Sequence, residues 1–256
     1  MRYTLVHGGL HGAWCWERLI PELEALGHTA VAVEMPGHGV RRGERSTLAG
    51  YRDAVLEVLE PGDVLVGHST GCPVATLAAD ALPDIRHIVY LAGPLPVEGK
   101  PLAFDSGGGR RDDGTVKTMS DFDDGADNFL RVSGDGQFFT VDYEGAVKCF
   151  FHDCDADTAA WAFQRMTPQC IDVMVTEPIS VPRFWKADIS RSFIRCADDR
   201  AFPRELSERQ IRRLGVAPLE IEGSHSPFLS RPAELARLLV QAPATRPIAP
   251  LDPEGA

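Results

Sequence analysis

One stretch, from Val64 to Gly71, constrains this chain more than any other. Its apolar first half ends in Gly67-His68-Ser69-Thr70-Gly71, and a helix-compatible segment follows at 72–82. A strand that turns tightly into a helix lifts a serine hydroxyl out of the backbone, where a neighbouring base can activate it. The two glycines leave room for such a turn, and the following helix N-terminus directs N–H groups toward developing negative charge. Ser69 is therefore the candidate nucleophile.

Length, charge and cysteine content narrow the class of protein. The 256 residues, 44% of them hydrophobic, suffice for one sizeable domain with a large insertion. A formal net charge of -11 argues against nucleic acid and against an anionic membrane surface as the main partner. We expect no membrane span, because no apolar run is long enough. The first residues lack a signal-peptide pattern and the six cysteines lack metal-ligand spacing, so we expect a cytoplasmic protein with free thiols.

Strand-like and helix-like segments alternate about six times along the chain. The predicted strands are 3–7, 29–34, 64–68, 87–92, 192–196 and 216–221, and the predicted helices outside the insertion are 17–28, 48–59, 72–82, 203–214 and 232–241. This alternation predicts an α/β fold with a doubly wound, mostly parallel sheet of about six strands, covered by helices on both faces. In such sheets the chemistry gathers on loops at the carboxyl ends of the strands.

Residues 97–188 interrupt this alternation. Between positions 100 and 157 there are thirteen acidic and six basic side chains, with several glycine-rich turns. A disordered acidic linker is the alternative, but its many aromatic residues argue for packing. We predict a cap of residues 97–188 inserted into a core of residues 1–96 and 189–241. Residues 242–256, with four prolines in fifteen positions, are predicted to be a disordered tail.

Three loops at the predicted sheet edge carry the groups needed to activate a serine. Ser69 follows one strand, Asp198 and Asp199 follow a second, and His225 follows the last. His225 would accept the serine proton and return it to a leaving group, while a carboxylate would hold the imidazole in the correct tautomer. The spacing alone does not separate Asp198 from Asp199.

A second glycine-rich turn, His7-Gly8-Gly9-Leu10-His11, follows the first predicted strand. Such a turn can present backbone N–H groups to an anion. Histidines four residues apart share a face only in a helix, which these glycines disfavour. We therefore expect structural hydrogen bonds from His7 and His11 within the turn, and no metal site.

Taken together, these motifs resemble the α/β-hydrolases, in particular the branch of plant methylesterases and hydroxynitrile lyases with their bacterial esterase relatives. The resemblance covers about residues 2–241 and is weak across 98–157. The segments that carry it are Val6-His7-Gly8-Gly9, His11-Gly12-Ala13-Trp14, Leu23 to His28, Gly67 to Gly71, Met166-Thr167-Pro168-Gln169, Cys196 to Asp199 with Pro203, Glu205, Gln210 and Ile211, and Gly223-Ser224-His225.

The resemblance implies site residues as well as a fold. It places the triad acid at Asp199 and the oxyanion hole at the backbone N–H groups of Gly9 and Thr70. The lyases of this branch carry a lysine directly after the catalytic histidine and a threonine in the oxyanion loop. This chain has Ser226 and Gly8 at those positions. Both departures favour ester hydrolysis over cyanohydrin cleavage.

The resulting expectation is a serine hydrolase that cleaves a carboxylic ester of a small or medium organic molecule through an acyl-enzyme, without a cofactor. The expected partner is that small-molecule ester, and a homodimer is left open. One alternative is a non-hydrolytic enzyme of the same fold, a hydroxynitrile-type lyase or a cofactor-free oxygenase. Another is a ligand receptor with residual hydrolase activity. The candidates for an apolar pocket, with ordinary core packing as the alternative, are Trp14, Trp161, Phe228 and the turn at Pro168.

Overall fold

The computed structural model describes residues 1–106, 109–110, 116–117 and 129–253. The predicted cap at 97–188 and the predicted tail at 242–256 therefore lie partly outside the described residues. All of the predicted core segments lie within them.

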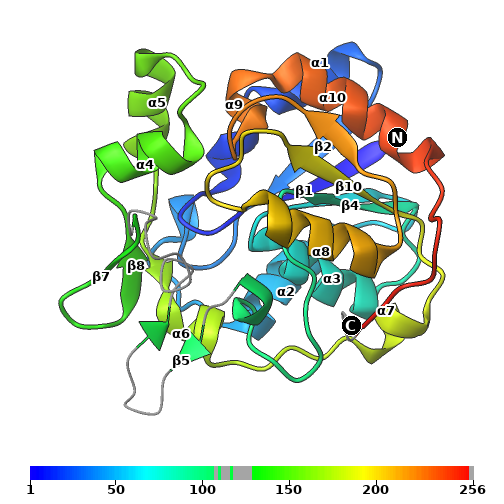
Figure 1. Ribbon diagram of the computed structural model, residues 1–256, viewed down its shortest axis with the longest axis horizontal. Coiled ribbons are helices and arrows are strands. Elements are labelled where there is room, and N and C mark those ends of the chain that lie inside the picture. The colour runs from blue at the N-terminus through cyan, green and yellow to red at the C-terminus, as the bar shows by residue number, and fades with distance from the viewer. Residues whose placement is uncertain (107–108, 111–115, 118–128, 254–256) are drawn as a thin grey trace.

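Within the described residues, a sheet of six strands forms the centre of the molecule (Figure 1). Its strands are β1 (Arg2–Val6), β2 (Thr29–Val33), β3 (Val64–His68), β4 (His87–Leu91), β10 (Arg191–Cys196) and β11 (Leu219–Ile221). Their spatial order is β11-β10-β4-β3-β1-β2, and each neighbouring pair is parallel. The predicted parallel sheet of the α/β-hydrolase fold is confirmed, with β3 near its middle.

Helices cover both faces of this sheet. The first face packs on α2 (Leu48–Leu56), α3 (Gly71–Ala81), α7 (Pro182–Lys186) and α8 (Arg204–Leu214). The second packs on η1 (Ala13–Trp16), α1 (Leu19–Ala25), α9 (Pro227–Ser230) and α10 (Pro232–Gln241). Leu65 and Val66 of β3 are both fully buried, yet they belong to opposite hydrophobic clusters. Successive side chains of a strand point to opposite faces, so a strand buried on both sides is apolar throughout.

The insertion contributes smaller elements that lie to one side of the sheet (Figure 1). They are η3 (Phe104–Ser106), β5 (Gly109–Arg110), β6 (Val116–Lys117), β7 (Arg131–Val132), β8 (Phe138–Thr140), α4 (Tyr143–Phe150), α5 (Ala156–Phe163), β9 (Gln169–Cys170) and α6 (Ile171–Val175). Two short helical turns, η2 (Gly39–Arg41) and η5 (Ala242–Ala244), lie outside the insertion. Antiparallel pairing joins β7 to β8 and β8 to β9.

Not all of the insertion lies over the site. Phe184 of α7 is fully buried in the cluster beneath the sheet. Asp80 of α3 accepts hydrogen bonds from the N–H groups of Arg183 (2.7 Å) and Phe184 (2.8 Å). This part of the segment therefore covers the sheet, and the division of the chain into core and cap stays a prediction.

The described part of the tail, residues 242–253, differs from the expected disorder. The N–H groups of Ile248 (2.7 Å) and Ala249 (3.1 Å) donate to the carbonyl of Gly215. The buried guanidinium of Arg191 donates to the carbonyl of Ala249 (2.9 Å), and that of Arg213 to the carbonyl of Pro253 (3.0 Å). A buried guanidinium needs acceptors, and an extended proline-rich segment offers carbonyls that no helix or sheet has used. This pairing fixes a tail that composition alone marks as disordered.

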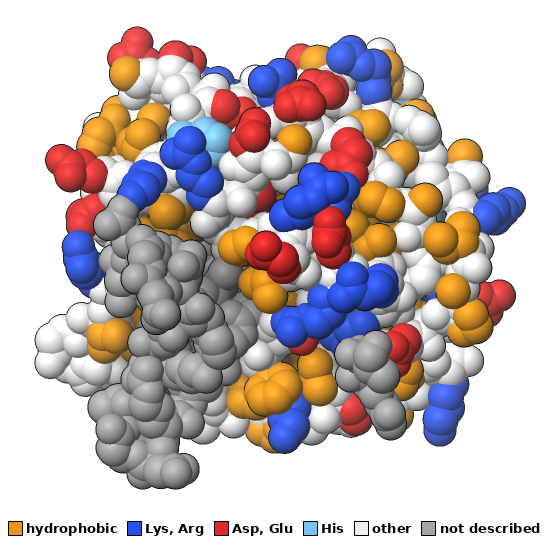
Figure 2. Space-filling view, in the orientation of Figure 1, with side chains coloured by type: hydrophobic (Ala, Val, Ile, Leu, Met, Phe, Trp, Pro, Cys, Tyr) orange, Lys and Arg blue, Asp and Glu red, His pale blue; other side chains and the backbone are white. Residues whose placement is uncertain are grey.

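The described residues contain no helix that is both long enough and apolar enough to cross a bilayer. On the face seen in Figure 2, basic and acidic side chains are interspersed. Arg195 of β10 pairs with Glu208 and Glu220, and Arg204 pairs with Glu208.

Truncating the chain after Pro247 should destabilise it, because Arg191 and Arg213 lose acceptors while staying buried. Hydrogen bonds to charged groups contribute about 1.5–3 kcal/mol each, so we expect a loss of about 3 kcal/mol in the free energy of unfolding. Urea denaturation followed by circular dichroism measures this loss. Truncation after Pro253 is the control, since it keeps these contacts. Equal midpoints for the two truncated proteins would contradict the prediction.

Candidate active site

Ser69 occupies a strained turn between β3 and α3. Its φ of +51° lies in the left-handed region, which non-glycine residues rarely adopt. A Cβ on Gly71 would lie 2.4 Å from the carbonyl oxygen of His7, and one on Gly67 would lie 2.6 Å from the Cα of Cys72. Only glycine fits at either position. The strand, tight turn and helix expected from the sequence are therefore present.

The turn at Ser69 lies beside the loop that follows β1. Strands β1 and β3 are neighbours in the sheet, with β2 on the far side of β1 and β4 on the far side of β3. Loops that leave such a switch point diverge and leave a crevice between them. The N–H of Gly9 donates to Oγ1 of Thr70 at 2.6 Å, which brings together the two residues expected to form the oxyanion hole. No described residue accepts a hydrogen bond from the N–H of Thr70.

His225 and Asp199 form a hydrogen-bonded pair. The Nδ1 of His225 lies 2.7 Å from Oδ2 of Asp199, and the two side chains are only 2% and 4% exposed. The other carboxylate oxygen accepts from the N–H groups of Ala201 (2.9 Å) and Phe202 (2.8 Å). The side chain of Asp198 is exposed. The geometry thus separates the two aspartates that spacing left open and pairs His225 with Asp199.

Ser69 and His225 both line one cavity of about 100 Å³. Gly9 and Thr70 line it too, whereas Asp199 lies behind His225. The remaining lining residues are mostly apolar and are Leu10, His11, Pro94, Ala103, Phe129, Leu130, Phe139, Phe150, Gln169, Met174, Val175, Ala201 and Phe202. The structure brings together the five predicted site residues, which come from four loops of the core.

Of the candidate pocket residues, Trp14, Trp161 and Phe228 follow the alternative of ordinary packing, whereas the turn at Pro168 leads directly into Gln169, which lines the cavity. Trp14 stacks on the ring of His11 and meets Trp161 edge-on, at centroid distances of 5.4 and 5.5 Å. Phe228 packs against Trp16 at 4.9 Å. None of these side chains lines the described cavity. Most of the aromatic lining comes instead from the insertion, where the sequence shows no regular spacing that would tell an inward side chain from an outward one.

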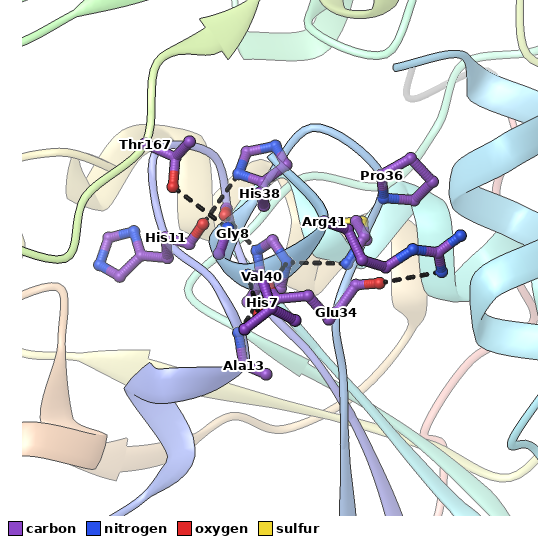
Figure 3. Close-up of polar contacts among 12 residues, drawn as sticks. His7, Gly8, His11, Ala13, Glu34, Pro36, His38, Val40, Arg41 and Thr167 are labelled. Atoms are coloured by element: carbon purple, nitrogen blue, oxygen red, sulfur yellow. Dashed lines mark hydrogen bonds and ion pairs between the residues drawn. The ribbon is translucent and has the colours of Figure 1, made fainter. Parts of the chain in front are cut away.

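Besides His225, four buried histidines lie around the site, and each uses one ring nitrogen to contact a backbone carbonyl; they are His7, His11, His38 and His68. The Nδ1 atoms of His7, His11 and His38 lie 2.8 Å from the carbonyls of Gly8, Gly9 and His11, respectively. Figure 3 shows His7 beside Gly8 and His38 beside His11. A carbonyl oxygen only accepts, so each Nδ1 carries the proton. The expected structural role of His7 and His11 within the turn is confirmed.

Burial keeps these imidazoles neutral. Desolvation lowers the pKa of His11 and of His38 to about 4, and it lowers the pKa of His7 and of His68 well below the ordinary value. His68, the residue before Ser69, places its Nε2 2.9 Å from the carbonyl of His225. A neutral imidazole donates through one ring nitrogen and accepts through the other. The contact with a carbonyl therefore fixes which nitrogen of each of these histidines is the donor and which is the acceptor.

The loop after β1 is also held from β2 and from the insertion. Glu34, one residue beyond β2, accepts from the N–H groups of Ala13 (3.0 Å) and Val40 (3.3 Å). The N–H of Thr167 donates to the carbonyl of Leu10 at 2.9 Å. Figure 3 shows Ala13, Glu34, Val40 and Thr167. The backbone beside Ser69 is therefore fixed from several sides.

Acidification should destabilise the fold through these histidines. The pKa of His11 and of His38 is about 4 in the folded protein, against 6.5 in the unfolded chain. Between pH 4 and pH 6.5 the unfolded chain therefore binds more protons than the folded protein does. Stability therefore falls as the pH falls through this window, by about 1 kcal/mol for each of the two between pH 7.5 and 5.5. Urea midpoints at the two pH values measure the effect. His38→Asn should shrink the shift, and unmoved wild-type midpoints would sink the idea.

Comparison with known proteins identifies the family of this chain. A model of the alpha/beta hydrolase family matches residues 5–238. The chain belongs to this family. Methylesterase 9 of Arabidopsis thaliana is 30% identical to it over 267 aligned positions, which cover 93% of this chain and 96% of that protein. Norfluorocurarine synthase 2 of a Strychnos species is 29% identical over 257 positions, covering 93% and 94%.

Among solved structures, an extracellular α/β-hydrolase from a Paenibacillus species has the same fold. It superimposes with a TM-score of 0.77 at 23% identity and covers 94% of this chain and 98% of that one. The relatives include proteins named as esterases, among them methylesterase 9 and polyneuridine aldehyde esterase of Rauvolfia serpentina.

Proposed function

We propose that this protein is a serine hydrolase that cleaves a carboxylic ester of a small or medium organic molecule. The observation that carries the proposal is the hydrogen-bonded pair of His225 and Asp199 at the cavity that also holds the strained Ser69. Methylesterases and esterases among the relatives support the same reaction class. Three residue types in this arrangement are what activation of a serine requires.

The proposed reaction proceeds through an acyl-enzyme. Asp199 accepts a hydrogen bond from the Nδ1–H of His225, which leaves the lone pair of Nε2 as the base. That base takes the proton of Ser69 as its oxygen attacks the ester carbonyl, and His225 then returns the proton to the departing alcohol. In the second half of the reaction His225 takes a proton from water as the water oxygen attacks the acyl carbonyl. His225 then returns a proton to the oxygen of Ser69 as the carboxylic acid leaves.

The N–H groups of Gly9 and Thr70 are the proposed donors to the oxyanion. The N–H of Gly9 donates to the hydroxyl of Thr70 in the free protein, so the substrate oxygen would replace that hydroxyl. The N-terminus of α3 adds its partial positive charge at the same point. Donors of this kind act on charge that appears only as the reaction proceeds, so they favour the transition state over the bound ester.

Two features favour ester hydrolysis over a lyase reaction. A Cβ on Gly8 would lie 2.9 Å from both the Nδ1 of His68 and the Cβ of Ser69, so a threonine does not fit at this position without displacing one of them. The described residues that line the cavity include no lysine or arginine. A cyanide leaving group would therefore meet no cationic side chain among them.

The proposed setting follows from composition. A small-molecule ester is the proposed partner, and a homodimer stays open. All six cysteines are free thiols, as a reducing compartment would keep them, and we propose the cytoplasm as the location.

Replacing the nucleophile tests the reaction class. Ser69→Ala should abolish hydrolysis of p-nitrophenyl esters of graded chain length, a loss of at least about 10⁴-fold. It should also abolish covalent labelling by a fluorophosphonate, which wild type should accept at Ser69. A wild-type protein inert to both reagents would turn attention to the receptor or to a non-hydrolytic reaction.

Paired aspartate variants test the assignment of the acid. Asp199→Asn removes the acceptor that fixes the tautomer of His225 and should lower kcat/KM by about 10³–10⁴-fold. Asp198→Asn, the same change on the adjacent exposed residue, should leave kcat/KM within about twofold of wild type. Steady-state kinetics on one ester measures both. The reverse ranking of the two variants would refute the assignment.

A further inference from the structure

Gln169 of the insertion lies directly over the oxyanion loop. Its β9 backbone pairs with Phe139 of β8, and two residues earlier the N–H of Thr167 donates to the carbonyl of Leu10. The residue is 3% exposed and lines the cavity shared by Ser69 and His225. None of the catalytic steps proposed above uses this buried amide.

The direction of the amide is fixed by its neighbours. Its Nε2 lies 3.2 Å from the carbonyl of Cys170 and 3.2 Å from the hydroxyl of Tyr51. A backbone carbonyl only accepts, so the NH₂ group must be the end that faces Cys170. The carbonyl oxygen of the amide, Oε1, therefore faces the other way.

A chain of hydrogen bonds reinforces this direction. The Nδ1–H of His38 donates to the carbonyl of His11, so the neutral ring offers the lone pair of Nε2. That nitrogen lies 3.1 Å from the hydroxyl of Tyr51, which must donate to it. The oxygen of Tyr51 is then left to accept from Gln169. Each hydrogen bond in this series has only one possible donor. The series ends at the amide of Gln169, whose oxygen points away from Tyr51.

The Oε1 atom lies beside the predicted oxyanion hole. A Cβ built on Gly9 would be 3.1 Å from Oε1 and 3.2 Å from Oγ1 of Thr70. No described residue donates a hydrogen bond to Oε1. The walls around it are mainly apolar. Gln169 lines the cavity, so a substrate that fills the cavity covers Oε1, and a substrate without a donor leaves this oxygen buried and unpaired.

We propose that Gln169 is a specificity residue that selects esters with a hydroxyl or N–H donor on the carbon next to the ester carbonyl. This inference rests on the proposed function, which places the ester carbonyl at Gly9 and Thr70. A donor on the adjacent carbon is then within reach of Oε1. An ester without such a donor leaves Oε1 buried and unpaired, and sites of this kind discriminate strongly against analogues that lack the group.

Matched esters test the inference. Methyl 2-hydroxyhexanoate carries the donor, methyl 2-methoxyhexanoate keeps the electron-withdrawing oxygen without the donor, and methyl hexanoate lacks both. Wild type should prefer the hydroxy ester to the methoxy ester by about 10–100-fold in kcat/KM. Gln169→Met keeps the side-chain length and removes the acceptor. It should bring the ratio of hydroxy to methoxy ester close to one by losing activity on the hydroxy ester.

The control variant is Gln137→Met, the same change at an exposed position just before β8. It should keep the wild-type ratio. Equal rates of wild type on the hydroxy and methoxy esters, or a preference that survives in Gln169→Met, would overturn the inference.

A binding measurement separates this inference from the proposed hydrolysis. The unreactive amides 2-hydroxyhexanamide and hexanamide probe the cavity without turnover. Wild type should gain more thermal stability from the hydroxylated amide, and Gln169→Met should not distinguish the two. If wild type hydrolyses none of the esters but still binds the two amides differently, the proposed hydrolase function is refuted and the role of Gln169 is retained. Equal stabilisation of wild type by both amides would remove that role whatever the esters show.

Discussion

The close backbone approach between the loop after β1 and the turn after β3 is the constraint on which the rest of the site depends. The α-carbon of Gly71 stands so near the carbonyls of Val6 and His7 that no side chain fits between them. This contact allows Gly9 to meet Thr70 at hydrogen-bond distance. The contact exists because β1 and β3 are neighbouring parallel strands, so the loops that follow them lie at the same edge of the sheet. After these two strands the chain continues in opposite directions across the sheet, to β2 and to β4.

Buried polar groups around this edge are organised by hydrogen-bond polarity rather than by charge. Burial disfavours a charged imidazole, so the buried histidines stay neutral and each has one donor and one acceptor nitrogen. Backbone carbonyls fix which nitrogen is the donor, and that choice passes from His38 through Tyr51 to Gln169. A cavity with mostly apolar walls can thereby present one oriented acceptor from the insertion.

Local sequence patterns predicted much of the core but less of the cavity. The strand, turn and helix around Ser69 were predictable because glycine spacing and apolar runs are local properties of the chain. The choice of Asp199 over Asp198 came only from a family resemblance, and the structure supplies the contact with His225. The sequence could not choose between pocket lining and core packing for the aromatic residues, because Trp14 and Phe228 satisfy the same apolar criterion as Phe139 and differ only in what they face.

The sequence by itself determined the parallel sheet, the order of its elements and the position of the strained serine. Those features depend on the alternation of buried strands with helices and on residues that are neighbours in the chain. Only the tertiary structure decided which side chains line the cavity, which way the amide of Gln169 points and how the proline-rich segment 242–253 is held. Each of these depends on buried donors and acceptors, such as Arg213 and the carbonyl of Pro253, that are far apart in sequence and find partners only when the chain has folded.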